Sequence, residues 1–181
     1  YLDAVAGRDP IELSSKAPKR LKKLLDGCSA KELEWRPAAG KWSIKEVLAH
    51  LADGEVMIAS RLRLVAAMDR PTIVGYDQDA FVARLGTEQR TAEECLDEFR
   101  ALRAINVALL SRLPKEAFAR LGLHSERGEE SLGHMVFLYA GQWLDRKLGS
   151  EPLFLYVGVF TGAAAAFYSM YRKLMADQRR E

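Results

Sequence analysis

The clearest helical pattern in the sequence is SIKEVLAHLADGEVMIASRLRLVAAMD, residues Ser43 to Asp69. Ser43 and Glu46 form the S-x-x-E pattern of a capping box, in which each side chain accepts a hydrogen bond from the other residue's backbone amide. The pattern predicts a helix that begins after Ser43 and ends near Asp69, before Pro71. At 100° per residue, the apolar side chains of one stripe are Ile44, Val47, Leu48, Leu51, Ile58, Leu62 and Val65. We therefore expect one long amphipathic helix packed against a core.

A first helix is predicted upstream, within DPIELSSKAPKRLKKLLDGCS. Asp9 is suited to cap it with Pro10 at its first position, and Gly27 is suited to end it. Pro18 is expected to bend or divide this helix, because proline removes a backbone hydrogen bond. The lysines and arginine from Lys16 to Lys23 are interpreted as a solvated helix face.

Two more helices are predicted downstream. Thr91 and Glu94 form a second capping box. The apolar stripe of the helix that follows is Cys95, Phe99, Leu102, Leu109 and Leu113. A last helix is expected to begin near Ser131, after a turn-like segment. Strand signals are weak throughout, so the fold class is predicted to be all-α, a four-helix bundle with polar connections.

The character of the chain changes after this bundle. Residues 153–171 contain no charged side chain, a length sufficient to cross a hydrocarbon core of about 30 Å. Basic residues flank the run, and tyrosines lie where interfacial aromatics belong. This predicts an appended apolar helix that spans a membrane; a buried fifth helix of a soluble oligomer is the alternative. The expected boundaries are a bundle at 9–148, the apolar helix at 149–175 and a polar tail at 176–181.

Composition excludes some classes of function. Lys and Arg total 27 against 25 Asp and Glu, for a formal net charge of +2, so nucleic-acid binding is not expected. The two cysteines, Cys28 and Cys95, are too few for a disulfide framework and fit a reduced compartment. We expect a cytoplasmic domain that is membrane-associated, or a cytoplasmic protein if the apolar helix is buried. Cys95 lies on an apolar stripe and is expected in the core.

The candidate functional side chains are the three histidines, His50, His124 and His134. His50 lies about 90° from the centre of the apolar stripe of its helix, where it could face a cavity or solvent. Glu55 falls close to that stripe, and a buried carboxylate needs a partner. A structural salt bridge is the simplest explanation of Glu55.

At this point the sequence resembles a known family. WRPAAGKWSIKEVLAHLADGE (35–55) and HSERGEESLGHMVFLYAG (124–141) are similar to DinB-like proteins of the DinB/YfiT type, four-helix bundles that include metal-dependent thiol transferases. The resemblance covers roughly residues 9–141. It implies a divalent metal (Ni, Zn or Mn) held by three histidines, one at the position of His50 and two spaced i, i+4 on the last helix. Gln142 and Arg146 occupy those two positions here, so only His50 remains of the implied ligands.

His134 and the C-terminal segment 141–174 also bear on the metal site and on the function. His134 does not obviously replace the missing ligands, although it could meet His50 across the bundle with Asp53, Glu129 or Glu130. GQWLDRKLGSEPLFLYVGVFTGAAAAFYSMYRKL (141–174) resembles the C-terminal half of AtpZ-type ATP synthase protein I, a small membrane protein. The two resemblances meet near residues 139–142, which suggests a fusion, natural or artefactual.

The resemblances imply two functions. The first is a metal-dependent transferase or hydrolase acting on small thiol adducts, weak or inactive because two of three metal histidines are missing. The alternative is a membrane-anchored, non-catalytic protein with an ATP synthase protein I-like C-terminal segment. The expected partners are a small thiol substrate, a second copy in a homodimer, and a membrane contacted through residues 153–171.

Overall fold

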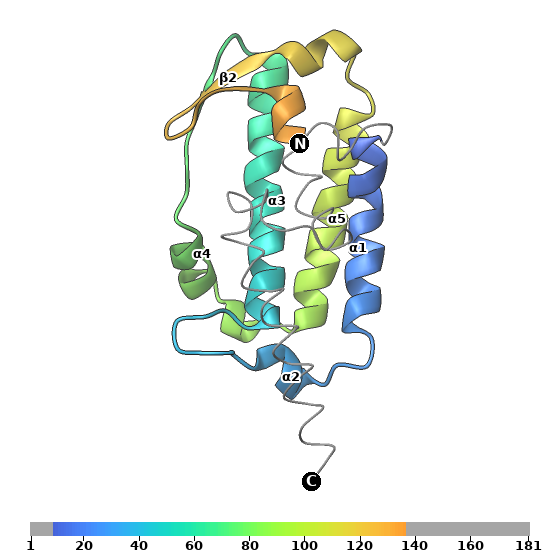
Figure 1. Cartoon of the computed structure of the whole chain (residues 1–181), viewed down its shortest axis with the longest axis vertical. Coiled ribbons are helices and arrows are strands. Elements are labelled where there is room, and N and C mark those ends of the chain that lie inside the picture. The colour runs from blue at the N-terminus through green and yellow to red at the C-terminus, as the bar shows by residue number, and fades with distance from the viewer. Residues whose placement is uncertain (1–8, 137–181) are drawn as a thin grey trace, which may run out of the picture.

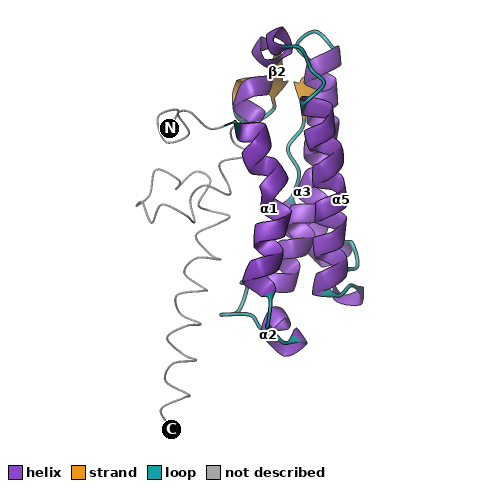
Figure 2. Ribbon diagram, turned by 90° about the vertical axis from the view of Figure 1, so that its right-hand side faces the viewer, coloured by secondary structure: helices purple, strands orange, loops and turns teal. Residues whose placement is uncertain are grey.

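Three long helices form the body of the molecule. The computed structural model describes residues 9–136, in which α1 (Pro10–Leu25), α3 (Ile44–Ala67) and α5 (Ala92–Leu110) run side by side (Figures 1 and 2). Both α1 and α3 pack against α5. Residues 132–136 are helical and begin where the fourth bundle helix is predicted, with Ser131 Oγ accepting a hydrogen bond from the His134 amide at 3.0 Å. The described part of the chain is thus mostly helical, as expected.

Capping boxes set the beginning of the central helices. Ser43 Oγ accepts from the Glu46 amide at 3.2 Å, and Glu46 Oε2 accepts from the Ser43 amide at 2.7 Å. Thr91 and Glu94 make the same exchange at the start of α5. Both predicted boxes are confirmed. A third box, between Ser29 and Glu32, begins the short helix α2 (Ala30–Glu34), which was not predicted.

The first helix also begins as predicted. Asp9 Oδ1 accepts from the Ile11 amide at 2.8 Å, and Pro10 occupies the first turn. Pro18 lies inside α1 without dividing it, so that alternative in the prediction was wrong. The lysines of this segment are exposed, in agreement with a solvated face.

The expectation of a strand-free bundle needs one correction. A three-stranded sheet is formed by β1 (Thr72–Ile73), β2 (Leu121–His124) and β3 (Gly128–Ser131). β1 pairs with β2 in parallel, with Thr72 opposite Leu123, and β2 and β3 form an antiparallel hairpin. Strands of two to four residues are too short to show a period-2 pattern, so periodicity could not predict them.

Short elements fill the remaining connections. The long link between α3 and α5 contains β1, α4 (Gln78–Arg84) and the 3-10 turn η2 (Thr87–Gln89). The turn η3 (Lys115–Ala119) connects α5 to β2. Figure 1 shows the sheet at the end of the bundle where α3 finishes, with α4 beside the other half of α3.

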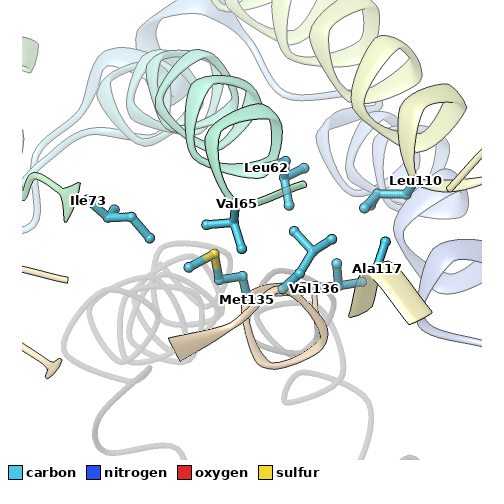
Figure 3. Packing of buried hydrophobic residues seen from close by; sticks show 8 residues of the cluster. Leu62, Val65, Ile73, Leu110, Ala117, Met135 and Val136 are labelled. Atoms are coloured by element: carbon cyan, nitrogen blue, oxygen red, sulfur yellow. The ribbon is translucent and has the colours of Figure 1, made fainter. Parts of the chain in front are cut away.

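The core has two apolar clusters separated by a polar layer. The cluster at the sheet end joins α3, α5, β1 and residues 132–136 (Figure 3), and consists of Leu62, Val65, Ile73, Leu110, Ala117, Leu132, Met135 and Val136. The other cluster consists of Leu48, Ala49, Ala52, Ala92, Cys95, Leu96 and Phe99. Cys95 is fully buried there, as predicted.

Glu55 occupies the polar layer between these clusters. Its carboxylate accepts from Arg103 Nε at 2.7 Å and from Asn106 Nδ2 at 3.0 Å. The predicted structural salt bridge is therefore present. It also corrects the predicted stripe of α5, because Arg103 and Asn106 are buried whereas Leu102 and Leu109 are only half-buried.

Several predictions fall on residues that the structure does not describe. The apolar run 153–171, the bundle boundary at 148 and the residues Gln142 and Arg146 lie outside 9–136. Within the described residues, no helix combines the length and the apolar character that a membrane crossing requires.

Candidate functional site on α3

His50 is held neutral in a buried position on α3. Its exposed fraction is 9%, and its ring lies against the indole of Trp42, with ring centroids 5.1 Å apart and a tilt of 42°. Burial lowers the pKa of His50 from 6.5 to about 4, and the negative charge of Asp79 on α4 opposes this only in part. A neutral imidazole, unlike a protonated one, is a form of histidine that can act as a metal ligand. The structure thus buries His50 against Trp42, and the side chain does not face solvent.

Asp53 lies three residues after His50, about one helical turn further along α3, so the two residues lie on the same side of the helix. The side chain is buried, and within residues 9–136 no group donates a hydrogen bond to its Oδ2. Burial raises the pKa of Asp53, the charge of Arg90 opposes this rise, and the charge of Glu98 adds to it. Arg90 itself donates to Glu98 at 2.6 Å. A buried carboxylate oxygen with spare acceptor capacity fits a cation or a donor from a ligand.

Tyr76 forms the side of this site. A Cβ atom added to Gly54 would lie 3.6 Å from the Tyr76 hydroxyl, so this phenol reaches the backbone of α3 beside Asp53. The Tyr76 ring packs on Phe81 of α4, with centroids 4.7 Å apart. Burial raises the pKa of the Tyr76 hydroxyl, which is therefore a neutral hydrogen-bond donor at physiological pH. Tyr76 carries no signal in the sequence because its contact with α3 is tertiary.

The metal that the fold family implies can be tested against these donors. His50 and Asp53 are chemically suitable, one a neutral imidazole and the other a carboxylate with a free oxygen. Among residues 9–136, no three side chains of His, Cys, Asp or Glu converge on one point. The described residues therefore offer His50 and Asp53 as candidate donors, and a third protein ligand would have to lie outside residues 9–136.

His134 and its acidic neighbours do not join His50. His134 is exposed, and residues 132–136 pack on Leu62 and Val65. Leu62 is twelve residues beyond His50, about 18 Å along the helix axis. Glu129 pairs with Arg70 and Glu130 with Arg127 at this distant end. Of the arrangement considered from the sequence, His50 and Asp53 lie one helical turn apart on α3, whereas His134, Glu129 and Glu130 lie toward its other end.

The family matches follow the two resemblances seen in the sequence. Residues 14–141 match the family model of the DinB superfamily. Residues 132–173 match a second model, described as "Putative F0F1-ATPase subunit Ca2+/Mg2+ transporter". The two matches share residues 132–141, which overlap the junction expected near residues 139–142.

Individual relatives point to the same bundle. A protein of Oceanobacillus iheyensis named "Putative metal-dependent hydrolase" is 28% identical over 123 residues, which are 68% of this chain and 71% of that protein. A Bacillus cereus protein of the same name is 27% identical over 123 residues, 68% and 70% of the two chains.

A solved structure shows the same fold. It is YfiT from Bacillus subtilis, described as "a probable metal-dependent hydrolase with an unusual four-helix bundle topology". The TM-score is 0.64 at 23% identity, and the match covers 77% of this chain and 86% of YfiT. The predicted DinB-like four-helix bundle is thereby confirmed, and the chain belongs to the DinB superfamily.

Proposed function

We propose that the α3 site binds a divalent metal ion and that the protein is a metal-dependent hydrolase or transferase of low activity. The observation that carries this proposal is the pair of donors on α3, a neutral His50 and a buried Asp53 whose Oδ2 accepts nothing within residues 9–136. Both relatives carry the name "Putative metal-dependent hydrolase", which supports the same class of function.

The residues of the chain have separate roles in this proposal. His50 would bind the ion through an imidazole nitrogen, and Asp53 would bind it directly or orient a water molecule beside it. The ion would activate a bound water or thiol. Tyr76 would donate a hydrogen bond to the substrate from the side of α3, since its hydroxyl lies beside Gly54.

We expect low activity because two of the metal-binding histidines typical of the family are replaced by other residues in this chain. By resemblance to the family, Gln142 and Arg146 stand where two metal histidines are expected. A glutamine amide is a weak ligand, and an arginine is a permanent cation that repels a metal ion. Three parts of this proposal rest on the family resemblance. They are a small thiol adduct as the substrate, Ni, Zn or Mn as the ion, and a homodimer as the assembly.

A calorimetric titration of the full chain with Ni, Zn and Mn salts tests the proposal. We expect one site per chain that His50→Ala abolishes and Asp53→Asn weakens. His134→Ala is the matched control, because that histidine is exposed at the opposite end of α3. Stoichiometric binding that survives His50→Ala would place the metal elsewhere, and no binding above background would refute metal dependence.

A second candidate function is favoured by the match of residues 132–173. In this alternative the protein is a non-catalytic bundle on the cytoplasmic side of a membrane, anchored through residues 153–171. Membrane fractionation of cells that express the full chain is the test. Recovery in the pellet and release by detergent, but not by high salt, is expected for an anchor. Recovery in the high-speed supernatant without detergent contradicts it.

A further inference from the structure

His124 presents a buried donor that has no acceptor among residues 9–136. Its side chain is 3% exposed, and its Nδ1 accepts a hydrogen bond from the Glu126 amide at 3.1 Å. Burial and the nearby charges of Arg127 and Arg61 lower the pKa of His124, so the ring is neutral. Since Nδ1 is an acceptor, the ring proton resides on Nε2. Within residues 9–136 this N–H meets no acceptor.

Arg61 on α3 presents a second donor of this kind. Its Nη2 donates to the Val74 carbonyl at 2.8 Å, just after β1, and its guanidinium carbon lies 5.7 Å from the centre of the Tyr76 ring. These contacts fix the plane of the guanidinium. The Nε–H is buried and has no acceptor in the described part of the chain.

The sheet places these two donors on facing elements. A Cβ atom on Gly122 of β2 would lie 2.7 Å from Val65 Cγ2, so this position of the strand touches α3. His124 is two residues later and points to the same side of the strand. Arg61 is one helical turn before Val65 and faces the same way. His124 lies near enough to Arg61 for the charge of this guanidinium to act on the imidazole, in agreement with this orientation.

The charges around the pair discriminate between anions. Glu130 is engaged by Arg127, whose Nη2 donates at 3.1 Å, and the Glu126 carboxylate lies against Gly75. Two carboxylates therefore border the pair, while a single guanidinium contributes an unengaged N–H. A monoanion with two oxygens matches one N–H from Arg61 and one from His124. A phosphate dianion would meet stronger repulsion and would lack donors for its third oxygen.

We propose that Arg61 and His124 form a binding site for the carboxylate group of a small organic molecule. Arg61 lies eleven residues after His50, within 20° of the same line on the helix and about 16 Å along its axis. The Tyr76 ring lies between them, since its hydroxyl reaches Gly54 and its face lies near Arg61, so the body of the molecule is apolar or aromatic at that point. Carboxylate binding itself does not depend on a metal; its use to anchor a substrate for chemistry at His50 rests on the proposed function.

The test is an NMR titration of the full chain, kept metal-free with a chelator, using hexanoate as the probe. We expect saturable shifts of the His124 Nε2 proton and the Arg61 Nε proton. Arg61→Lys keeps the charge but removes the Nε–H, and His124→Gln removes the ring donor. Each is expected to weaken binding about tenfold or more. Arg63→Lys is the matched control, because Arg63 is exposed on the same helix and donates to the Ala59 carbonyl.

The titration has outcomes that support the carboxylate site and outcomes that overturn it. Shifts in the wild type that are lost in both variants, with the control unchanged, support the site. Absent shifts at saturating hexanoate, equal affinity of the variants, or tighter binding of inorganic phosphate than of hexanoate overturns it. The wild-type shifts decide even if a variant is misfolded, which thermal unfolding detects. Metal binding at His50 is measured independently, so either proposal can fail while the other stands.

Discussion

Removal of Arg103 is expected to destabilise the bundle strongly, because it strands the Glu55 charge in the polar layer of the core. The two side chains are 5% and 2% exposed, and Arg103 reaches Glu55 Oε1 through Nε at 2.7 Å and Nη2 at 2.5 Å. Breaking a buried pair by removing one partner costs about 3–5 kcal/mol. Arg103→Met keeps most of the apolar stem over the Phe99 ring, which lies 4.8 Å from the guanidinium carbon, so the loss is mainly electrostatic.

The pH dependence identifies the origin of this loss. Burial raises the pKa of Glu55 above 4.5 even with Arg103 present, and the pKa rises further without the guanidinium. A raised carboxyl pKa means that the folded state binds the proton more tightly than the unfolded state, so the penalty is greatest at high pH. Arg103→Met should therefore lose more stability at about pH 8 than at about pH 5.

Urea denaturation followed by far-UV circular dichroism measures these free energies of unfolding. The double variant Glu55→Leu/Arg103→Met is expected to lose much less than the sum of the single losses, since it leaves no buried charge and Asn106 still donates to the Glu55 backbone carbonyl at 3.0 Å. Equal losses at both pH values, or single losses that add in the double variant, would refute the electrostatic explanation.

Three further predictions concern the cap, the sheet and the site. Ser43→Ala removes the cap of α3 and is expected to lower the unfolding free energy by about 1 kcal/mol, with the exposed Ser60→Ala as the control. Gly122→Ala places a methyl group 2.5 Å from Ile73 Cδ1 and is expected to cost about 1–3 kcal/mol in the same denaturation assay. For His50, whose pKa is lowered from 6.5 to about 4, the wild type loses about 3 kcal/mol as the pH falls across that interval, because the unfolded state takes up the proton first. His50→Gln lacks this loss; identical acid profiles of the two proteins would contradict a buried, neutral His50.

The beginnings of the helices could be predicted because their causes are local. Ser43 with Glu46 and Thr91 with Glu94 lie within one turn of each other, and each pair forms the expected box. The same S-x-x-E pattern at Ser29 was available in the sequence, so α2 could have been found by it. The capping pattern therefore predicts the start of α2 as well as the starts of α3 and α5.

The interior of α5 could not be predicted in the same way. Periodicity favoured Leu102 and Leu109, but Arg103 and Asn106 face inward. The cause is Glu55, which lies 48 residues from Arg103 in the sequence and needs donors in the core. A stripe calculated from one helix contains no information about a charge on another.

In the candidate site, too, residues with a local sequence signal could be predicted and residues placed by tertiary contacts could not. His50 was found from the edge of the apolar stripe and from the family resemblance. Asp53 was considered only as one of several partners. Tyr76 carried no signal because β1 and α4 bring it to α3, and Arg61 carried none because its partners, the Val74 carbonyl and the Tyr76 ring, lie in that same connection. The buried Nε2 of His124 depends on the hairpin of β2 and β3, whose strands are too short for a pattern.

The parallel pairing of β1 with β2 has a consequence for the order of folding. Thr72 and Leu123 lie opposite each other, so their pairing closes a chain segment that contains all of α5. Closing a loop of that length is entropically unfavourable until α5 has docked on α3, which makes the sheet a late event. A late element contributes little to the transition state, so Gly122→Ala should accelerate unfolding and leave the folding rate nearly unchanged. Stopped-flow chevrons measure this directly, and a slower folding arm would show that the sheet forms early.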